Sequence, residues 1–160
     1  MFLEASVYAI RRVPAEERKD RYGLLVLVMR QWPRGIKRSL IDVWIKDAGP
    51  SMETLTALRQ GLLSIEEFER HYEADLREQQ HCTVKSYVKR SDESDERVVI
   101  EQTYASPPME HLQHLERLHG KVTILCWELE PPCHRYFLLQ WLGGANWRRP
   151  YVSMCVTHSK

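Results

Sequence analysis

The feature that most constrains the fold is a continuous apolar run, Leu-Leu-Val-Leu-Val-Met, from Leu24 to Met29. The run is far shorter than the roughly 20 residues that a membrane-spanning helix needs. Its residues favour a strand, and no polar residue alternates with them, which is typical of a strand buried on both faces. The run therefore predicts the central strand of an α/β domain. A second apolar run, at 122–127, predicts another such strand.

Helix signals surround these two strands. Ser51 fits the N-cap of a helix to about Arg59, and the capping box Ser64-Ile-Glu-Glu67 begins a helix to about Glu78. Two further helices are expected at 107–119 and 133–142. The first is opened by Pro107 and Pro108, turns Met109, Leu112, Leu115 and Leu118 toward the core, and is closed by Gly120; the second is stopped by Gly143-Gly144.

The remaining segments are less regular. Glu4–Arg11 is expected to be a first strand near an edge, and Pro14–Tyr22 a polar connection. Leu40–Lys46 is expected to be a short helical or extended segment, and 151–156 a short last strand. Cys82–Arg90 and Arg97–Tyr104 predict a β-hairpin around an acidic turn.

Helices between apolar strands imply crossover connections. We therefore predict an α/β fold with a mainly parallel sheet, helices packed on it, and an inserted β-hairpin at about 82–105. The whole chain, 1–160, is expected to form one domain.

The composition is that of an ordinary globular protein, with 43% hydrophobic and 28% charged residues. No stretch resembles a membrane span or a secretory signal, so we expect a cytoplasmic protein with no membrane partner. In that compartment the four cysteines at 82, 126, 133 and 155 are expected to be reduced thiols. The net charge is +1, with basic ends and an acidic middle, which disfavours strong non-specific nucleic-acid binding.

Several motifs identify the family that the chain resembles. They are Val13-Pro-Ala-Glu16, the strand Leu24–Met29, Trp32-Pro-Arg-Gly-Ile-Lys37, Asp42-x-Trp44-x-Lys46, Pro50-Ser51, Phe68-x-x-x-Tyr72-x-x-x-Leu76, and Val122–Glu128 followed by Cys133-His-Arg135. In these motifs the chain resembles the YeaO-like family, domain of unknown function 488. The resemblance implies an α/β fold, cytoplasmic residence and no established activity. Family members usually carry an acidic residue where this chain has Met29, so an acid/base role shared through that position is not expected here.

The loop after the first buried strand is the first candidate site. Arg30, Arg34 and Lys37 cluster there around Trp32, beyond the carboxyl end of a core strand, where ligands of open α/β sheets usually bind. Guanidinium groups match phosphate or carboxylate oxygens, and an indole can stack on a base. The alternative is that Trp32 covers the sheet edge while the cations stay solvated.

The second candidate site is Cys133-His134-Arg135, at the expected first turn of a helix. Free N–H groups there favour an anion and a thiolate, and Arg135 would add a clamp. Cys133 is then a candidate nucleophile, with His134 or Glu128 as proton carrier. The alternatives are a capping cysteine, a surface histidine, and a structural pair between Glu128 and an arginine. A zinc site with Cys126 fits no usual ligand spacing, so no metal and no cofactor are expected.

The chain has no Walker loop, dinucleotide-binding fingerprint, serine elbow or His-Glu-x-x-His motif. The sequence therefore predicts an uncharacterised protein with a site for an anionic ligand, such as phosphate, a nucleotide or a sugar phosphate, at the carboxyl edge of the sheet. If it is an enzyme, which the residues leave open, a transferase or hydrolase is expected. The alternative is a non-catalytic module that binds nucleic acid or protein, and the hairpin edge leaves a homodimer open.

Overall fold

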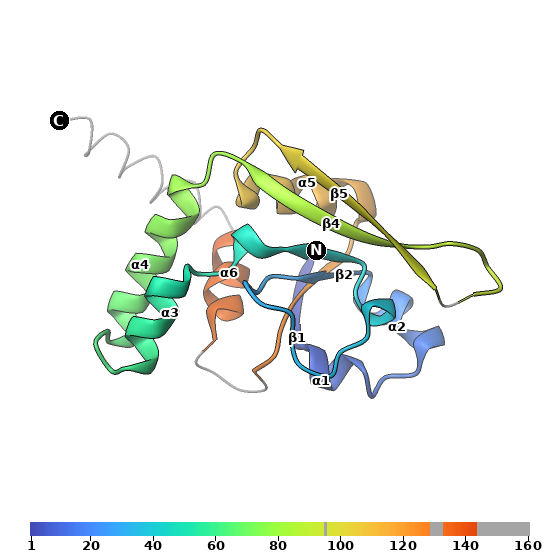
Figure 1. Cartoon of the computed structure of the whole chain (residues 1–160), viewed down its shortest axis with the longest axis horizontal. Helices are drawn as coiled ribbons and strands as arrows, with labels where there is room; N and C mark the ends of the chain where they lie inside the picture. The colour runs from blue at the N-terminus through green and yellow to red at the C-terminus, as the bar shows by residue number, and fades with distance from the viewer. Residues whose placement is uncertain (95, 129–132, 144–160) are drawn as a thin grey trace.

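The computed structural model describes residues 1–94, 96–128 and 133–143, and is built on one sheet with the strand order β1-β6-β2-β3-β4-β5 (Figure 1). The strands are β1 (Phe2–Ser6), β2 (Leu24–Leu27), β3 (Val43–Ile45), β4 (Cys82–Lys89), β5 (Arg97–Tyr104) and β6 (Val122–Cys126). The β1–β6, β6–β2 and β2–β3 pairs are parallel, whereas the β3–β4 and β4–β5 pairs are antiparallel.

The α/β prediction is therefore confirmed, but the prediction of a mainly parallel sheet is wrong. The expected hairpin forms, yet it is not an appendage, because β4 pairs with β3 and extends the sheet by two antiparallel strands. Chain direction within a pair depends on the path of the long connection, and the residues of β4 do not encode it.

The helices are α1 (Val7–Ile10), α2 (Ala15–Tyr22), α3 (Met52–Arg59), α4 (Ile65–Glu78), α5 (Pro108–His119) and α6 (His134–Leu142), with 3-10 turns η1 (Arg38–Leu40) and η2 (Lys46–Ala48). The four expected helices are all present. Ser51 accepts the Thr54 N–H, and Ser64 and Glu67 form the predicted capping box. The expected last strand at 151–156 lies outside the described residues.

Two predictions near the N-terminus are wrong. The first strand ends at Ser6, because its hydroxyl accepts the Tyr8 N–H and begins α1, where further strand was expected. The expected polar connection contains α2, whose first turn carries two glutamates, a favourable charge at a helix N-terminus. Short amphipathic or polar helices of this kind lack the apolar stripe by which sequence patterns identify helices.

Alternate residues of β2 enter two separate cores, one on each face of the sheet. Val26 joins the core under α4, α5 and α6, whereas Leu25 and Leu27 join the core that α1 and the 29–41 segment cover. This follows from the two-residue period of a strand and confirms that β2 is buried on both faces. No helix in the described part of the chain is long and apolar enough to cross a membrane.

One expectation about α5 is wrong. Leu118 is 64% exposed, because at about 3.6 residues per turn it lies on the helix face opposite the buried Met109. His111 is buried, and its ring lies 4.5 Å from that of Tyr104 at the end of β5. The hairpin therefore covers α5 from one side.

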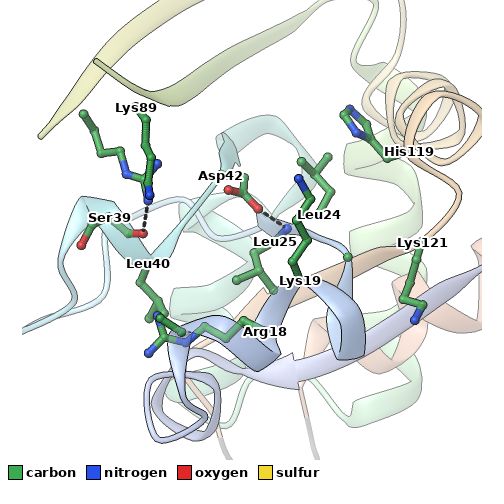
Figure 2. A pocket seen from close by; sticks show the side chains of 13 residues that line it. Arg18, Lys19, Leu24, Leu25, Ser39, Leu40, Asp42, Lys89, His119 and Lys121 are labelled. Atoms are coloured by element: carbon green, nitrogen blue, oxygen red, sulfur yellow. Dashed lines mark hydrogen bonds between the residues drawn. The ribbon is translucent and has the colours of Figure 1, made fainter. Parts of the chain in front are cut away.

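The two edges of the parallel strands carry different openings. A cavity of about 670 Å³ lies at the amino ends, between α2, the turn end of the β4–β5 hairpin and the turn before β6 (Figure 2). A cleft of about 490 Å³ lies at the carboxyl ends. Gly23 closes the connection between α2 and β2 with φ of +66°, and a Cβ atom there would lie 2.2 Å from the Lys121 carbonyl oxygen, so only glycine fits.

Candidate functional site

The cleft at the carboxyl edge is formed by the loop after β2, the start of α3 and the segment after β6. Its lining residues are Tyr8, Met29, Arg30, Gln31, Trp32, Pro33, Arg34, Pro50, Met52, Leu55, Arg59, Trp127, Glu128 and His134. β2 and β6 are parallel neighbours, so their carboxyl ends meet here. The structure thus brings most residues of the two sequence motifs to one opening.

The two arginines of the loop have different surroundings. Arg30 is partly buried, donates from Nε to the Pro50 carbonyl oxygen at 3.1 Å, and has Nη1 3.5 Å from a carboxylate oxygen of Asp47. Its charge therefore holds the loop against the segment before α3. Arg34 is exposed at the cleft, and its carbonyl oxygen accepts the Tyr8 hydroxyl at 2.8 Å. Lys37 is exposed but is not among the lining residues.

The indole of Trp32 forms a wall of the cleft. Its Nε1 donates to the Ile36 carbonyl oxygen at 2.8 Å, and its ring packs edge-on against Trp44 and Tyr87, at 5.2 and 5.5 Å between centroids. These contacts fix the ring as part of the second core, as in the alternative interpretation of this motif. Trp127 lines the same cleft and is 43% exposed, so it offers the accessible indole.

Sequence reasoning missed Arg59 in this cleft. It lies in the last turn of α3, is exposed, and faces the opening together with Arg34. An arginine near a helix C-terminus is usually explained by the helix dipole, so no local signal distinguished it. Only the fold, which places α3 at the same cleft as Trp127 and Glu128, brings this guanidinium to the site.

Glu128 follows β6 and is half-buried in the cleft wall. Its Oε2 atom is buried and has no hydrogen-bond partner among the described residues. Burial raises the pKa of this carboxyl, and the charges of Arg135 and Arg59 offset part of that rise. The group therefore keeps its proton to a higher pH than an ordinary glutamate, which suits proton donation or hydrogen bonding to an anion.

His134, in the first turn of α6, is buried with a defined tautomer. Its Nε2 lies 2.6 Å from the Val28 carbonyl oxygen, an acceptor, so Nε2 carries the proton. The Nδ1 lone pair then faces the Cys133 sulfur at 3.9 Å. Burial lowers the pKa of His134 to about 4, so the imidazole is neutral near pH 7. Its Nδ1 can accept a hydrogen bond from a neighbouring thiol, but with this lowered pKa it is a weak base and brings no positive charge.

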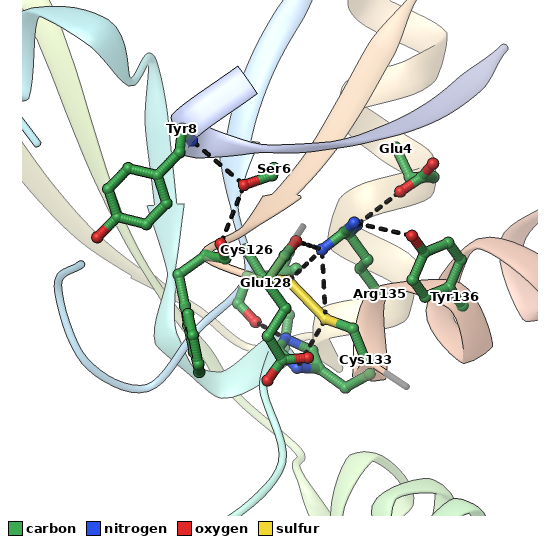
Figure 3. Close-up of a disulfide and its surroundings, with 12 residues drawn as sticks. Glu4, Ser6, Tyr8, Cys126, Glu128, Cys133, Arg135 and Tyr136 are labelled. Atoms are coloured by element: carbon green, nitrogen blue, oxygen red, sulfur yellow. Dashed lines mark hydrogen bonds and ion pairs between the residues drawn. A yellow bond between two sulfur atoms is a disulfide. The ribbon is translucent and has the colours of Figure 1, made fainter. Parts of the chain in front are cut away.

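Arg135 is 1% exposed and contacts the protein on every side that the structure describes (Figure 3). Nε donates to Glu4 Oε2 at 2.5 Å and Nη2 to the Tyr136 hydroxyl at 2.9 Å. Nη1 donates to the Glu128 carbonyl oxygen and lies 2.7 Å from the Cys126 sulfur. The guanidinium predicted to clamp a ligand therefore joins β1, β6 and α6, and it is absent from the cleft lining.

The sulfurs of Cys126 and Cys133 are in contact and are drawn as a disulfide in Figure 3. Their Cα atoms are 8.0 Å apart, whereas disulfides usually join Cα atoms about 4.4 to 6.8 Å apart. We therefore treat the pair as two convergent sulfurs rather than a closed bridge. Cys82 is free and buried, and burial raises the pKa of its thiol to about 12.

Cys126, Cys133 and His134 have potential metal-ligand atoms within 4.8 Å of one another. The spacing makes them the best candidate for a metal in the described part of the chain. The Arg135 guanidinium occupies the same space, 2.7 and 3.5 Å from the two sulfurs. A fixed positive charge there repels a second cation, so the cluster suits thiolate stabilisation better than metal binding.

Comparison with curated proteins and with solved structures found no match. A family model described as the inactive DUF488-N3 subclade matches residues 8–119. The match spans most of the chain and includes the loop after β2, α3, α4, the hairpin and α5, and it ends before β6. It confirms the resemblance seen in the sequence motifs. The chain belongs to the DUF488 family, in its inactive DUF488-N3 subclade.

Proposed function

We propose that the protein binds a small anionic ligand, such as a phosphate, nucleotide or sugar phosphate, in the cleft at the carboxyl edge and does not turn it over. The observation that carries this proposal is the exposure of two guanidinium groups, Arg34 and Arg59, beside the accessible indole of Trp127. No ion pair is recorded for either arginine in the described part of the chain, so both charges remain available to a ligand. Cytoplasmic residence belongs to the same proposal.

Two facts favour binding without catalysis. The subclade is described as inactive. Met29, the residue that replaces the usual acidic side chain of the family, is buried and lines the cleft, so the position offers neither a general base nor a metal ligand. A cleft of about 490 Å³ has the size of a small-molecule site. The anion would contact guanidinium groups while an adjoining planar group stacks on the indole.

The test is thermal unfolding at low salt with phosphate, nucleotides, sugar phosphates and a short oligonucleotide. Wild type is compared with Arg34→Gln, Arg59→Gln and the control Lys37→Gln, which removes an exposed cation of the same loop outside the cleft. A ligand at 100 times its Kd adds about 2.7 kcal/mol of stability. One small anion should stabilise wild type and the control but neither cleft variant. Equal responses of all four proteins would refute the site, and a response to the oligonucleotide alone would favour a nucleic-acid-binding module.

The sulfur cluster supports a second candidate, thiol chemistry at Cys133. The specific observation is that the Arg135 guanidinium lies beside both sulfurs, where its charge stabilises a thiolate, while the His134 Nδ1 faces the Cys133 sulfur as a hydrogen-bond acceptor. Cys133 would then be the nucleophile of a transferase or hydrolase, with His134 or Glu128 carrying the proton. Rapid alkylation of Cys133 at pH 6 would favour this candidate, and alkylation at the rate of an unperturbed thiol would exclude it.

A further inference from the structure

The cavity at the amino edge of the parallel strands is separate from the cleft of the candidate site. It is lined by Ala15, Arg18, Lys19, Gly23, Leu24, Leu25, Ser39, Leu40, Asp42, Lys89, Arg97, His119 and Lys121. These residues come from α2, the starts of β2 and β6, the segment before β3, the turn end of the hairpin and the end of α5. In Figure 2, Lys89 lies on the side of the hairpin, whereas Lys19 and Lys121 lie on the other side of the cavity.

Positive charge dominates the lining. Five lysine and arginine side chains and His119 face one carboxylate, that of Asp42. Asp42 is held by the fold, because its Oδ2 accepts the Leu25 N–H at 2.8 Å, and burial raises the pKa of the carboxyl. A single carboxylate with a raised pKa cannot balance five cations. The excess charge therefore needs another explanation.

Three of these cations are fixed in place by neutral acceptors. Arg18 donates to the Val13 and Arg11 carbonyl oxygens at 2.8 and 3.3 Å. Arg97 donates to the Ser39 carbonyl oxygen at 3.0 Å, and Lys121 to that of Asp20 at 2.7 Å. Carbonyl oxygens position a cation without cancelling its charge. Arg97 Nε is also buried without a hydrogen-bond partner among the described residues, which leaves a donor for a ligand oxygen.

We propose that this cavity binds a small ligand with two or more phosphate groups. Its volume of about 670 Å³ is within the usual range for small-molecule sites, and its cations lie on opposite walls, so one phosphate cannot reach them all. None of the lining residues that the structure describes is Trp, Tyr or Phe, so recognition rests on the phosphates and not on stacked bases. The hairpin then has a function in binding, since it contributes Lys89 and Arg97.

The site is independent of the cleft in the proposed function, because the two lie at opposite ends of the parallel strands. Lys19 and Lys89 are the best positions for a test. Both are exposed, and no side-chain hydrogen bond or ion pair is recorded for either in the described part of the chain. Replacing them by glutamine removes two charges from opposite walls and breaks no side-chain hydrogen bond or ion pair between described residues.

The experiment is isothermal titration calorimetry at low, constant ionic strength with inorganic tripolyphosphate and orthophosphate as probes. Wild type is compared with the double variant Lys19→Gln/Lys89→Gln, with the matched control Arg12→Gln/Lys37→Gln, which removes two exposed cations outside both openings, and with the cleft variant Arg34→Gln/Arg59→Gln. Wild type and the control should bind tripolyphosphate at least tenfold more tightly than orthophosphate. The Lys19→Gln/Lys89→Gln variant should bind it at least tenfold more weakly than wild type.

Any of the following outcomes overturns the proposal. Undetectable binding of tripolyphosphate to wild type, or equal affinity for the two probes, would mean that the charges do not act together. Equal loss in the control variant would mean that only the overall charge matters, and loss in the cleft variant but not in Lys19→Gln/Lys89→Gln would place the anion at the carboxyl edge and support the proposed function instead. Tighter binding of a short single-stranded oligonucleotide, lost in the Lys19→Gln/Lys89→Gln variant, would identify a nucleic-acid surface and exclude a small-molecule site.

Discussion

Replacing Arg135 by methionine tests whether this residue supports the fold or binds a ligand. Methionine keeps much of the apolar volume but removes every donor. The guanidinium bonds to Glu4, Tyr136 and the Glu128 carbonyl oxygen would be lost together. Because Arg135 is 1% exposed, water cannot readily replace it at the carbonyl oxygen. We expect a large loss of folding free energy.

The size of this loss depends on how deeply each partner of the Arg135–Glu4 ion pair is buried. Removing one partner of a buried pair costs about 3 to 5 kcal/mol, because a charge is left buried without compensation. The Glu4 side chain is 27% exposed, so its carboxylate keeps some water, which places the loss at the low end of that range. The methionine variant also relieves the desolvation of the cation. We therefore expect a loss of about 3 kcal/mol, a large fraction of the roughly 5 to 15 kcal/mol typical of a domain.

Urea unfolding at pH 7 measures this loss, and Glu4→Gln is the matched control. Glutamine keeps an acceptor oxygen for Arg135 but leaves its buried charge without a counter-ion, so Glu4→Gln should also cost about 3 kcal/mol. In the double-mutant cycle the two losses should not add, because both report one contact. A loss below about 1 kcal/mol for Arg135→Met, together with lost anion binding, would refute the structural role.

Three further results are expected. His134 has a pKa of about 4 when folded and 6.5 unfolded, so folding stability should fall between pH 6.5 and 4, by roughly 3 kcal/mol in total, as the unfolded chain takes up a proton. Urea titrations should show that slope in wild type but not in His134→Gln. Gly23→Ala should lose more than about 1 kcal/mol of folding free energy in the same assay, because φ is positive and the added Cβ would meet the Lys121 carbonyl oxygen. Gly35→Ala should lose less, because φ is +77° there but no atom lies near the added Cβ. Cys82 should resist alkylation at pH 8 until the protein unfolds, and native labelling detected by mass spectrometry would contradict its burial.

The sequence predicted individual helices and strands better than it predicted which strands pair and which side chains meet. Apolar runs and caps identify β2, β6 and four helices, because each signal is contained within about ten residues. The pairing of β6 between β1 and β2 depends on contacts more than 90 residues apart along the chain. The partner of Arg135 is likewise Glu4, at the other end of the described chain. Local pattern carries no information about such pairs.

The same distinction explains which site residues keep the role predicted for them. A cation in a motif can bind a ligand only if the fold leaves its charge uncompensated. Arg30 pairs with Asp47, and Arg135 pairs with Glu4 and donates to the Glu128 carbonyl oxygen, so both guanidinium groups are bound within the protein. The uncompensated charges lie elsewhere: Arg34 and Arg59 at the carboxyl edge, and the cavity cations at the amino edge. Charge balance around each side chain, which only the fold determines, therefore decides between structural and binding arginines.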